Sequence, residues 1–392
     1  MVVDLTHHIA GPYCTKMLAD YGAEVIKVER PGLGDPTRRA GPFPGDLPDM
    51  EKSGLFLYLN TNKKGITLNL KSTMGKAILK RLVAMADLVV ESFSPRVMPS
   101  LGLGYEELVK VRPGLIMTSI SSFGQTGPYR DYRASEIVAY AMGGSLYLIG
   151  EPDRVPLKGP LAQAQYLTGL FACGSTLAAI LRRARMGSGD HVDVSIMEAV
   201  AAVQESTTTT YAYSGTVWRR AGSRRPEAHP WTILPCRDGY VVVGVSTPVQ
   251  WEMMTAMLDM PELAEDPRFA TAQRRFQHAD ELDAILSPWF KDRTKQEIYE
   301  LAQLWRVPFS PVPDLSEVAS SPQLAARRYF ETISHPVAGV LPYAGAPFRL
   351  GVASSRAQQP APLLGQHNVE IYCKWLGFSK QDLVRLREQG VI

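Results

Sequence analysis

The stretch from Leu5 to Arg39, LTHHIAGPYCTKMLADYGAEVIKVERPGLGDPTRR, carries the clearest fold signal in the chain. The apolar run that leads into it, residues 2–5, predicts a short buried strand. A helix is predicted over residues 15–21, and residues 24–29 predict a second strand after the glycine that ends the helix. This β-α-β unit ends in a turn over residues 30–35, whose backbone N–H groups and cations suit an anion.

The composition is that of a globular protein long enough for two domains. The chain has 392 residues, of which 45% are hydrophobic and 21% are charged. A net charge of +3 is too small to indicate a nucleic-acid or membrane partner. The most apolar run, residues 167–181, is shorter than the ~18 residues of a membrane span, so it predicts a buried helix. No basic region follows Met1, so we expect no signal peptide and a cytoplasmic protein.

Neither the cysteines nor the histidines are spaced like metal ligands. The four cysteines are scattered and form no C-x-x-C pair, which favours reduced, buried thiols. His7 and His8 are adjacent, so in a strand their side chains would face opposite ways. The motifs of P-loop proteins, zinc proteases and α/β-hydrolases are absent as well. We therefore expect no metal site.

Strand-like and helical runs alternate through the first half of the chain. Three runs predict strands, at residues 66–70, 88–91 and 115–120. Residues 72–86 predict an amphipathic helix with Ser72 as its N-cap. This alternation predicts an α/β domain with a mainly parallel sheet. The composition changes at residues 219–225, which look like a flexible basic linker.

Six segments, in order, resemble the family III CoA-transferases of the formyl-CoA and carnitine-CoA type. The first is the opening stretch, residues 5–39. The others are similar to the family motifs N-x-N-K-x-x-x-x-L, V-E-N-F-x-P, G-x-x-G-P-Y, G-x-x-V-D-V-S and L-G-x-H-N, and they lie at residues 60–70, 90–95, 124–129, 189–195 and 364–368.

The resemblance implies an α/β fold with a large Rossmann-like domain built from both chain ends and a smaller middle α+β domain. Residues 1–218 would form the first part of the large domain, and residues 331–392 would return to it. Residues 219–330 would form the linker and the small domain. The family resemblance further implies a dimer of two interlocked subunits, with coenzyme A bound along the large domain as part of an acyl-CoA substrate.

Matched position by position, the family's CoA contacts fall on Arg30, Lys63, Phe93 and Arg133. Cationic side chains suit the nucleotide phosphates, with arginine offering a rigid two-pronged donor. Phe93 suits packing against adenine. Two alternatives stay open, namely Lys63 as a solvated loop lysine and Phe93 as a core aromatic residue.

The chain departs from the family at the position of the catalytic nucleophile. The resemblance implies an aspartate just before a T-G or S-G pair that opens a buried helix, and the aligned residue here is Gln165. An ionised carboxylate can attack a thioester, whereas a neutral amide cannot. The nearest matching acid is Glu136, for which the alternative is a structural hydrogen-bond acceptor.

Three functions are consistent with this substitution. The first is the CoA-binding subunit of a heteromeric transferase such as benzylsuccinate CoA-transferase, whose second family III chain supplies the aspartate. The second is a homodimeric enzyme that uses Glu136 or direct transfer, and the third is a non-catalytic acyl-CoA-binding regulator. By analogy with the heteromeric members, succinyl-CoA would be the donor and an aromatic or dicarboxylic acid the acceptor. The arginines of residues 219–225 would then hold the acceptor carboxylate or remain solvated.

Overall fold

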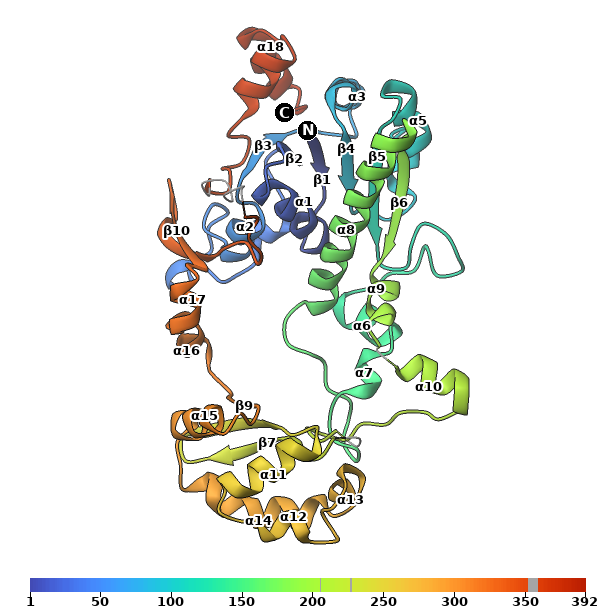
Figure 1. Ribbon diagram of the computed structural model, residues 1–392. Helices are drawn as coiled ribbons and strands as arrows, with labels where there is room; N and C mark the ends of the chain where they lie inside the picture. Colours follow the sequence, from blue (N-terminus) through green and yellow to red (C-terminus); the bar gives the residue numbers. More distant parts are fainter. Residues whose placement is uncertain (205, 226–227, 352–358) are drawn as a thin grey trace. The chain divides into compact units, whose positions relative to one another are not determined.

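The computed structural model describes residues 1–204, 206–225, 228–351 and 359–392 (Figure 1). The chain divides into two compact units. Unit 1 contains residues 1–145, 158–208 and 325–392, and unit 2 contains residues 146–157 and 209–324. Both chain ends therefore contribute to the larger unit. The structure differs from the predicted domain ranges chiefly in the segment 146–157, which joins unit 2.

A parallel six-stranded sheet forms the centre of unit 1, in the order β3-β2-β1-β4-β5-β6. This is the strand order of doubly wound nucleotide-binding folds, and it reverses direction between β1 and β4. The strands are β1 (Val2–Leu5), β2 (Val25–Glu29), β3 (Lys63–Thr67), β4 (Leu88–Glu91), β5 (Ile116–Ser121) and β6 (Asp190–Ser195). β1 and β4 have the predicted bounds, whereas the strand predicted at residues 66–70 already begins at Lys63.

Helices cover both faces of the sheet, because successive strand residues point to opposite sides. In β1, Val3 and Leu5 belong to one core and Val2 to the other. The first core also contains residues of α3 (Thr73–Met85), α5 (Tyr105–Val111) and α18 (Lys380–Glu388). The second core contains residues of α1 (Ala10–Asp20) and of α8 (Gln163–Met186), the long green helix beside β6 in Figure 1.

Shorter elements complete unit 1. They are 3-10 helices at Pro36–Arg39 and Pro44–Asp46, α2 (Gly54–Leu59), α4 (Val97–Ser100), α6 (Glu136–Met142), α9 (Ile196–Ala202), the hairpin of β10 (Phe330–His335) and β11 (Gly339–Ala344), and a π-helix at Val369–Trp375. Three helices lie where the chain passes from one unit to the other, namely α7 (Ser145–Leu148), α10 (Thr207–Ser214) and α17 (Pro322–Ala326).

The C-terminal tail closes the outer edge of β3. His367 Nδ1 accepts the backbone N–H of Gly65 at 3.0 Å. The side-chain oxygen of Asn368 accepts the N–H of Thr67 at 3.0 Å, and its amide nitrogen donates to Thr67 Oγ1 at 2.8 Å. An unpaired strand edge is a template for association with another chain, so these bonds give the L-G-x-H-N segment a structural purpose.

Buried ion pairs hold the turn that follows β2. Lys27 on β2 lies 2.9 Å from Asp35, and neither side chain is exposed. Glu29 accepts two hydrogen bonds from the buried guanidinium of Arg38, at 2.7 and 2.8 Å. These four charged residues of the opening stretch therefore pair with one another inside the fold, where a buried charge requires a partner.

Only one face of α8 is buried, whereas the sequence predicted a buried helix over residues 167–181. Its inner side approaches α1 so closely that a Cβ atom on Gly169 would lie 2.7 Å from the carbonyl oxygen of Ala10. Large apolar side chains on the other side are 42–66% exposed, namely Leu170, Phe171, Leu177 and Leu181. By length and composition alone α8 could cross a membrane, a test that core helices of soluble proteins also pass.

Unit 2 has its own hydrophobic core between an antiparallel sheet and a set of helices. The sheet contains β7 (Trp231–Cys236), β8 (Gly239–Gly244) and β9 (Phe309–Pro311). The helices are α11 (Pro248–Met257), α12 (Glu262–Glu265), α13 (Ala272–Gln277), α14 (Ala279–Lys291), α15 (Lys295–Leu304) and α16 (Leu315–Ala319).

Residues 219–225, predicted to be a flexible linker, are tied to unit 2 instead. Arg220 donates to the backbone oxygen of Glu151 at 3.1 Å, which explains why residues 146–157 belong to this unit. Arg224 forms ion pairs with Asp280 at 2.8 Å and Asp283 at 2.6 Å. These two arginines are therefore engaged in holding the unit together.

Candidate active site

The carboxyl ends of three neighbouring strands surround a cavity of about 840 Å³ in unit 1. His7 follows β1, Phe93 follows β4 and Ser122 follows β5, and all three residues line it. Open α/β sheets bind their ligands outside the carboxyl ends of the strands, at the point where the strand order reverses. That point lies between β1 and β4 here, so this cavity is the candidate active site.

A smaller cavity of about 290 Å³ shares His7 and Phe93 with the first. Its other walls include Val28 and Arg30 at the end of β2 and Leu68 just beyond β3. The rings of His7 and Phe93 meet edge to face, with their centroids 5.4 Å apart. The two cavities therefore adjoin along the carboxyl edge of the sheet.

Three of the four residues predicted to contact CoA line these cavities. Arg30 lines the smaller cavity, Arg133 lines the larger one, and Phe93 lines both. The two arginine side chains are exposed, and Phe93 packs with one part against the core of the sheet. An aromatic ring between two exposed cations suits a ligand that carries phosphates and a planar ring.

Lys63, the fourth of these residues, lies away from both cavities and is fully buried. Its Nζ is 3.1 Å from Asp4 and donates at 2.8–3.0 Å to Pro12 O, Thr15 Oγ1 and Asn60 Oδ1. Burial lowers the pKa of Lys63 to about 8. An ammonium has three donors, and these four acceptors occupy them. This geometry argues against direct contact with CoA and contradicts the alternative of a solvated loop lysine.

Gln165 and Glu136 line the same wall of the larger cavity. Gln165 lies in the first turn of α8, and Glu136 is the first residue of α6. Glu136 Oε1 accepts the backbone N–H of Ala164 at 2.9 Å and lies 3.9 Å from Lys158 Nζ. The first N–H groups of a helix lack partners within the helix, so Glu136 caps α8 directly beside Gln165. Its other oxygen, Oε2, is buried and has no hydrogen-bond partner in the described part of the chain.

The larger cavity also contains charged residues that the sequence motifs did not single out. Arg96 donates to Asp131 Oδ1 at 2.8 Å, and Arg130 lies 3.6 Å from the same carboxylate. Arg96 directly follows the V-E-S-F-S-P segment, and Arg130 and Asp131 follow G-Q-T-G-P-Y. Their position next to two motifs was a signal that could have identified them. Counting Arg133, three arginines face two carboxylates here, which favours an anionic ligand.

His7 lines both cavities. Its backbone N–H donates to Ser92 Oγ at 2.9 Å, which fixes the chain beyond β1 against the end of β4. Burial and the nearby Lys27 lower the pKa of His7, so the imidazole is neutral at physiological pH. Among the described residues, no group of three or more His, Cys, Asp or Glu side chains is arranged to hold a metal ion.

Known proteins share this fold and are similar in sequence along nearly the whole chain. The crystal structure of a CAIB/BAIF family protein from Brucella suis matches with a TM-score of 0.84 at 33% identity, over 95% of this chain and 97% of that chain. The chain is 37% identical to succinyl-CoA–D-citramalate CoA-transferase of Chloroflexus aurantiacus, over 100% of this chain and 96% of that protein. It is 33% identical to the BbsE subunit of succinyl-CoA:(R)-benzylsuccinate CoA-transferase of Thauera aromatica, over 98% of this chain and 96% of that subunit.

The fold, the cavity at the strand ends and these relatives define a CoA-transferase or a subunit of one. The chain belongs to CoA-transferase family III, whose family model matches residues 1–368. The family resemblance of the sequence motifs is thereby confirmed, together with the α/β fold that it implied.

Proposed function

We propose that this chain is the CoA-binding subunit of a heteromeric CoA-transferase, whose second family III chain carries the nucleophile. The supporting observation is that Gln165 lies in the wall of the larger cavity, at the position that the sequence resemblance matches to the aspartate of the family. The carboxylates of this wall are Asp131, paired with Arg96, and Glu136, which caps α8. Neither takes the position that the family mechanism assigns to its nucleophile.

That mechanism explains why an amide at position 165 matters. The aspartate attacks the thioester carbonyl, the C–S bond breaks, and the CoA thiolate leaves a mixed anhydride behind. The thiolate then attacks the aspartyl carbonyl and releases the donor acid, which gives an aspartyl-CoA thioester. The acceptor carboxylate attacks that thioester, the C–S bond breaks, and a second mixed anhydride forms. The released thiolate then attacks the acceptor carbonyl of this anhydride, which gives the new acyl-CoA and frees the aspartate. The amide of Gln165 carries no anionic oxygen and cannot begin this cycle.

We propose succinyl-CoA as the donor and a dicarboxylic or aromatic acid as the acceptor. Succinyl-CoA stands in the names of several relatives, with D-citramalate, glutarate or (R)-benzylsuccinate as the second substrate. Arg130 and Arg133 in the wall of the larger cavity suit a substrate that keeps a free carboxylate beyond the thioester.

The proposed partner is a second family III chain in an interlocked dimer, within the cytoplasm. The exposed apolar side of α8 supports this proposal, because contiguous apolar surface marks sites of protein association. A second copy of this chain would cover the same surface in a homodimer. The pairing therefore has to be decided by experiment.

The native mass of the complex purified from its own cells tests the pairing. A mixed dimer with a family III chain that carries the aspartate supports the proposal, and its two purified subunits should transfer CoA only when combined. A homodimer that transfers CoA at ordinary enzymatic rates would refute it.

The variant Gln165→Asp tests the site itself. It should give the isolated chain measurable transfer from succinyl-CoA if the rest of the site is intact. Gln163→Asp is the matched control, because it makes the same change two residues earlier and outside the cavity lining. A folded Gln165→Asp variant that binds CoA but has no activity would argue against a preserved site.

The second candidate is a homodimeric enzyme that uses Glu136. The unpartnered Oε2 of Glu136 in the cavity wall favours it. Glu136→Gln should then abolish turnover, whereas Glu300→Gln on α15 should not. If the turnover of Glu136→Gln is unchanged, Glu136 only caps α8 and takes no part in catalysis. CoA affinity without transfer, even beside every candidate partner chain, would instead support a regulator.

A further inference from the structure

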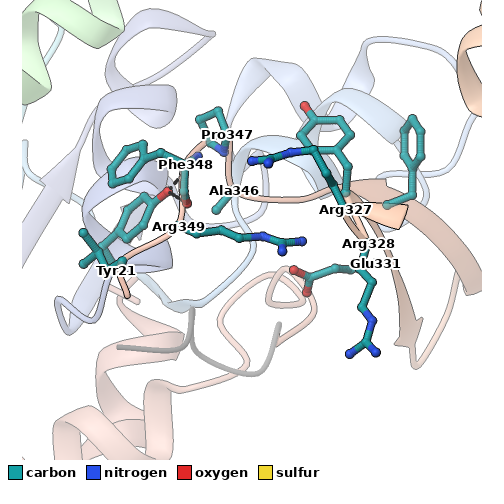
Figure 2. Close-up of a pocket in the computed structure, with 11 residues that line it drawn as sticks. Tyr21, Arg327, Arg328, Glu331, Ala346, Pro347, Phe348 and Arg349 are labelled. Carbon is teal, nitrogen blue, oxygen red and sulfur yellow. Dashed lines mark hydrogen bonds between the residues drawn. The ribbon is translucent and has the colours of Figure 1, made fainter. Parts of the chain in front are cut away.

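A third cavity, of about 470 Å³, lies at the opposite end of α1 from the candidate active site (Figure 2). Tyr21, the residue that follows α1, lines it together with residues 327–331 and 346–350. Ala10, the first residue of α1, lines the candidate active site. Eleven helical residues span about 16 Å, and the two cavities share no residue. This cavity is therefore a separate place in unit 1.

Its walls carry an excess of positive charge. Arg327, Arg328 and Arg349 line it, with Glu331 as the acid among the lining residues. In Figure 2 the side chain of Arg349 extends across the cavity toward Glu331. Within the described residues the three guanidiniums form no ion pair, whereas Arg38 and Arg224 each bind carboxylates. Three exposed guanidiniums thus face one concave space without matching acids.

The backbone around these arginines is held in place. The rings of Tyr21 and Phe348 stack at 4.0 Å with an angle of 6° between them. The hydroxyl of Tyr21 also donates to Phe348 O at 2.6 Å, which fixes the residue next to Arg349. On the facing segment, Arg328 has a φ of 48°, a left-handed conformation that is unfavourable for a residue with a side chain. Strained backbone of this kind is often kept at ligand sites.

We propose that this cavity binds a small organic anion with at least two carboxylate or phosphate groups, at a site separate from that of CoA. A guanidinium pairs with either group through two parallel hydrogen bonds. Three guanidiniums against one carboxylate give the walls a net charge of +2, which a ligand with two negative charges would balance. The cavity volume falls within the range of small-molecule sites, and Pro347, Phe348 and Leu350 supply an apolar wall for the carbon skeleton.

Calorimetric titration with two probes tests this proposal and separates the two anion types. Citrate represents carboxylates and inorganic pyrophosphate represents phosphates, and each is titrated into the full chain in the presence of saturating CoA. At least one probe should bind, and the double variant Arg327→Gln/Arg349→Gln should weaken it at least about tenfold. Arg349→Glu also lowers the charge of the walls by two, so it should weaken binding to a similar degree. Arg185→Gln on α8, outside this cavity, is the matched control and should leave affinity unchanged.

Three outcomes would overturn the proposal. The first is that neither probe binds, and the second is that a probe binds only when CoA is left out. The third is that the double variant binds as well as the wild type does. If the double variant instead dissociates a dimer and no probe binds the wild type, these arginines form a subunit contact. Unchanged circular dichroism and CoA affinity of the variants would establish that they fold, and none of these readouts depends on whether the chain transfers CoA.

Discussion

Replacing Lys63 by methionine tests whether this residue is a buried ion-pair partner or a direct contact of CoA. In the structure its Nζ is enclosed by four acceptors, and neither Lys63 nor Asp4 is exposed. Methionine keeps the length and bulk of the side chain but removes the charge and the three donors. Asp4 would then be a buried carboxylate that has lost its nearest cation.

The magnitude follows from these contacts. Removing one partner of a buried ion pair costs about 3–5 kcal/mol. Asp4 keeps hydrogen bonds from Thr15 Oγ1 at 2.6 Å and from Thr6 N at 2.9 Å, which favours the lower half of this range. Three further oxygens, on Pro12, Thr15 and Asn60, lose a donor, which adds to the loss. We expect Lys63→Met to lower the free energy of unfolding by about 4 kcal/mol.

Urea unfolding followed by circular dichroism measures this change, and Lys64→Met provides the control. Lys64 is 29% exposed and pairs with Glu24 and Glu370 at the surface, so its loss should cost only about 1 kcal/mol. Under native conditions the folded Lys63 variant should bind CoA like the wild type. A stability within about 1 kcal/mol of the wild type, combined with a CoA affinity about tenfold weaker, would refute this reasoning and favour direct contact with CoA.

Three further changes test other parts of the structure. Burial raises the pKa of Glu91 from its ordinary 4.5 to about 7, so between these values the folded protein retains a proton that the unfolded chain releases. The wild type should therefore lose about 3 kcal/mol of stability relative to Glu91→Gln as pH rises through this window. The prediction is contradicted if the urea midpoints of the two proteins differ by the same amount at about pH 5 and at about pH 8. Gly169→Ala should cost about 1–3 kcal/mol because its Cβ would lie 2.7 Å from the α1 backbone, whereas Gly174→Ala, with no atom within 4 Å, should be neutral or stabilising in thermal unfolding. Asn368→Ala removes two hydrogen bonds from Thr67, so hydrogen exchange in β3 should become faster while exchange in unit 2 does not.

The sequence predicts those parts of the fold whose signals are local. β1 and β4 have the predicted bounds because each is an apolar run between turn residues. β3 was predicted three residues too late because its first residue is a lysine, which looks like part of a loop. The partner that allows Lys63 to be buried is Asp4, which lies 59 positions earlier. A pairing over that distance leaves no periodic signal.

In the candidate site too, residues within sequence motifs were predicted, whereas contacts between residues far apart in the sequence were not. Family motifs led to Arg30, Phe93 and Arg133, and the structure brings them to two adjoining cavities. They could not indicate the ion pair of Arg96 and Asp131, which joins two loops 35 positions apart. Nor could they indicate that α8 buries one face only, since apolar residues occur on both sides of it.

The motifs that identify the family mostly hold the fold together, and this limits what they say about catalysis. Asp193 of one motif accepts the backbone N–H of Gln125 in another at 2.9 Å. Asn368 bonds the edge of β3, and Lys63 is a buried ion-pair partner. If a second chain carries the nucleophile, as proposed, both chains need the same sheet, so both are expected to keep these contacts. Position 165 is therefore the residue at which the two kinds of subunit are expected to differ, and changing it alone is the most direct test of what this chain does.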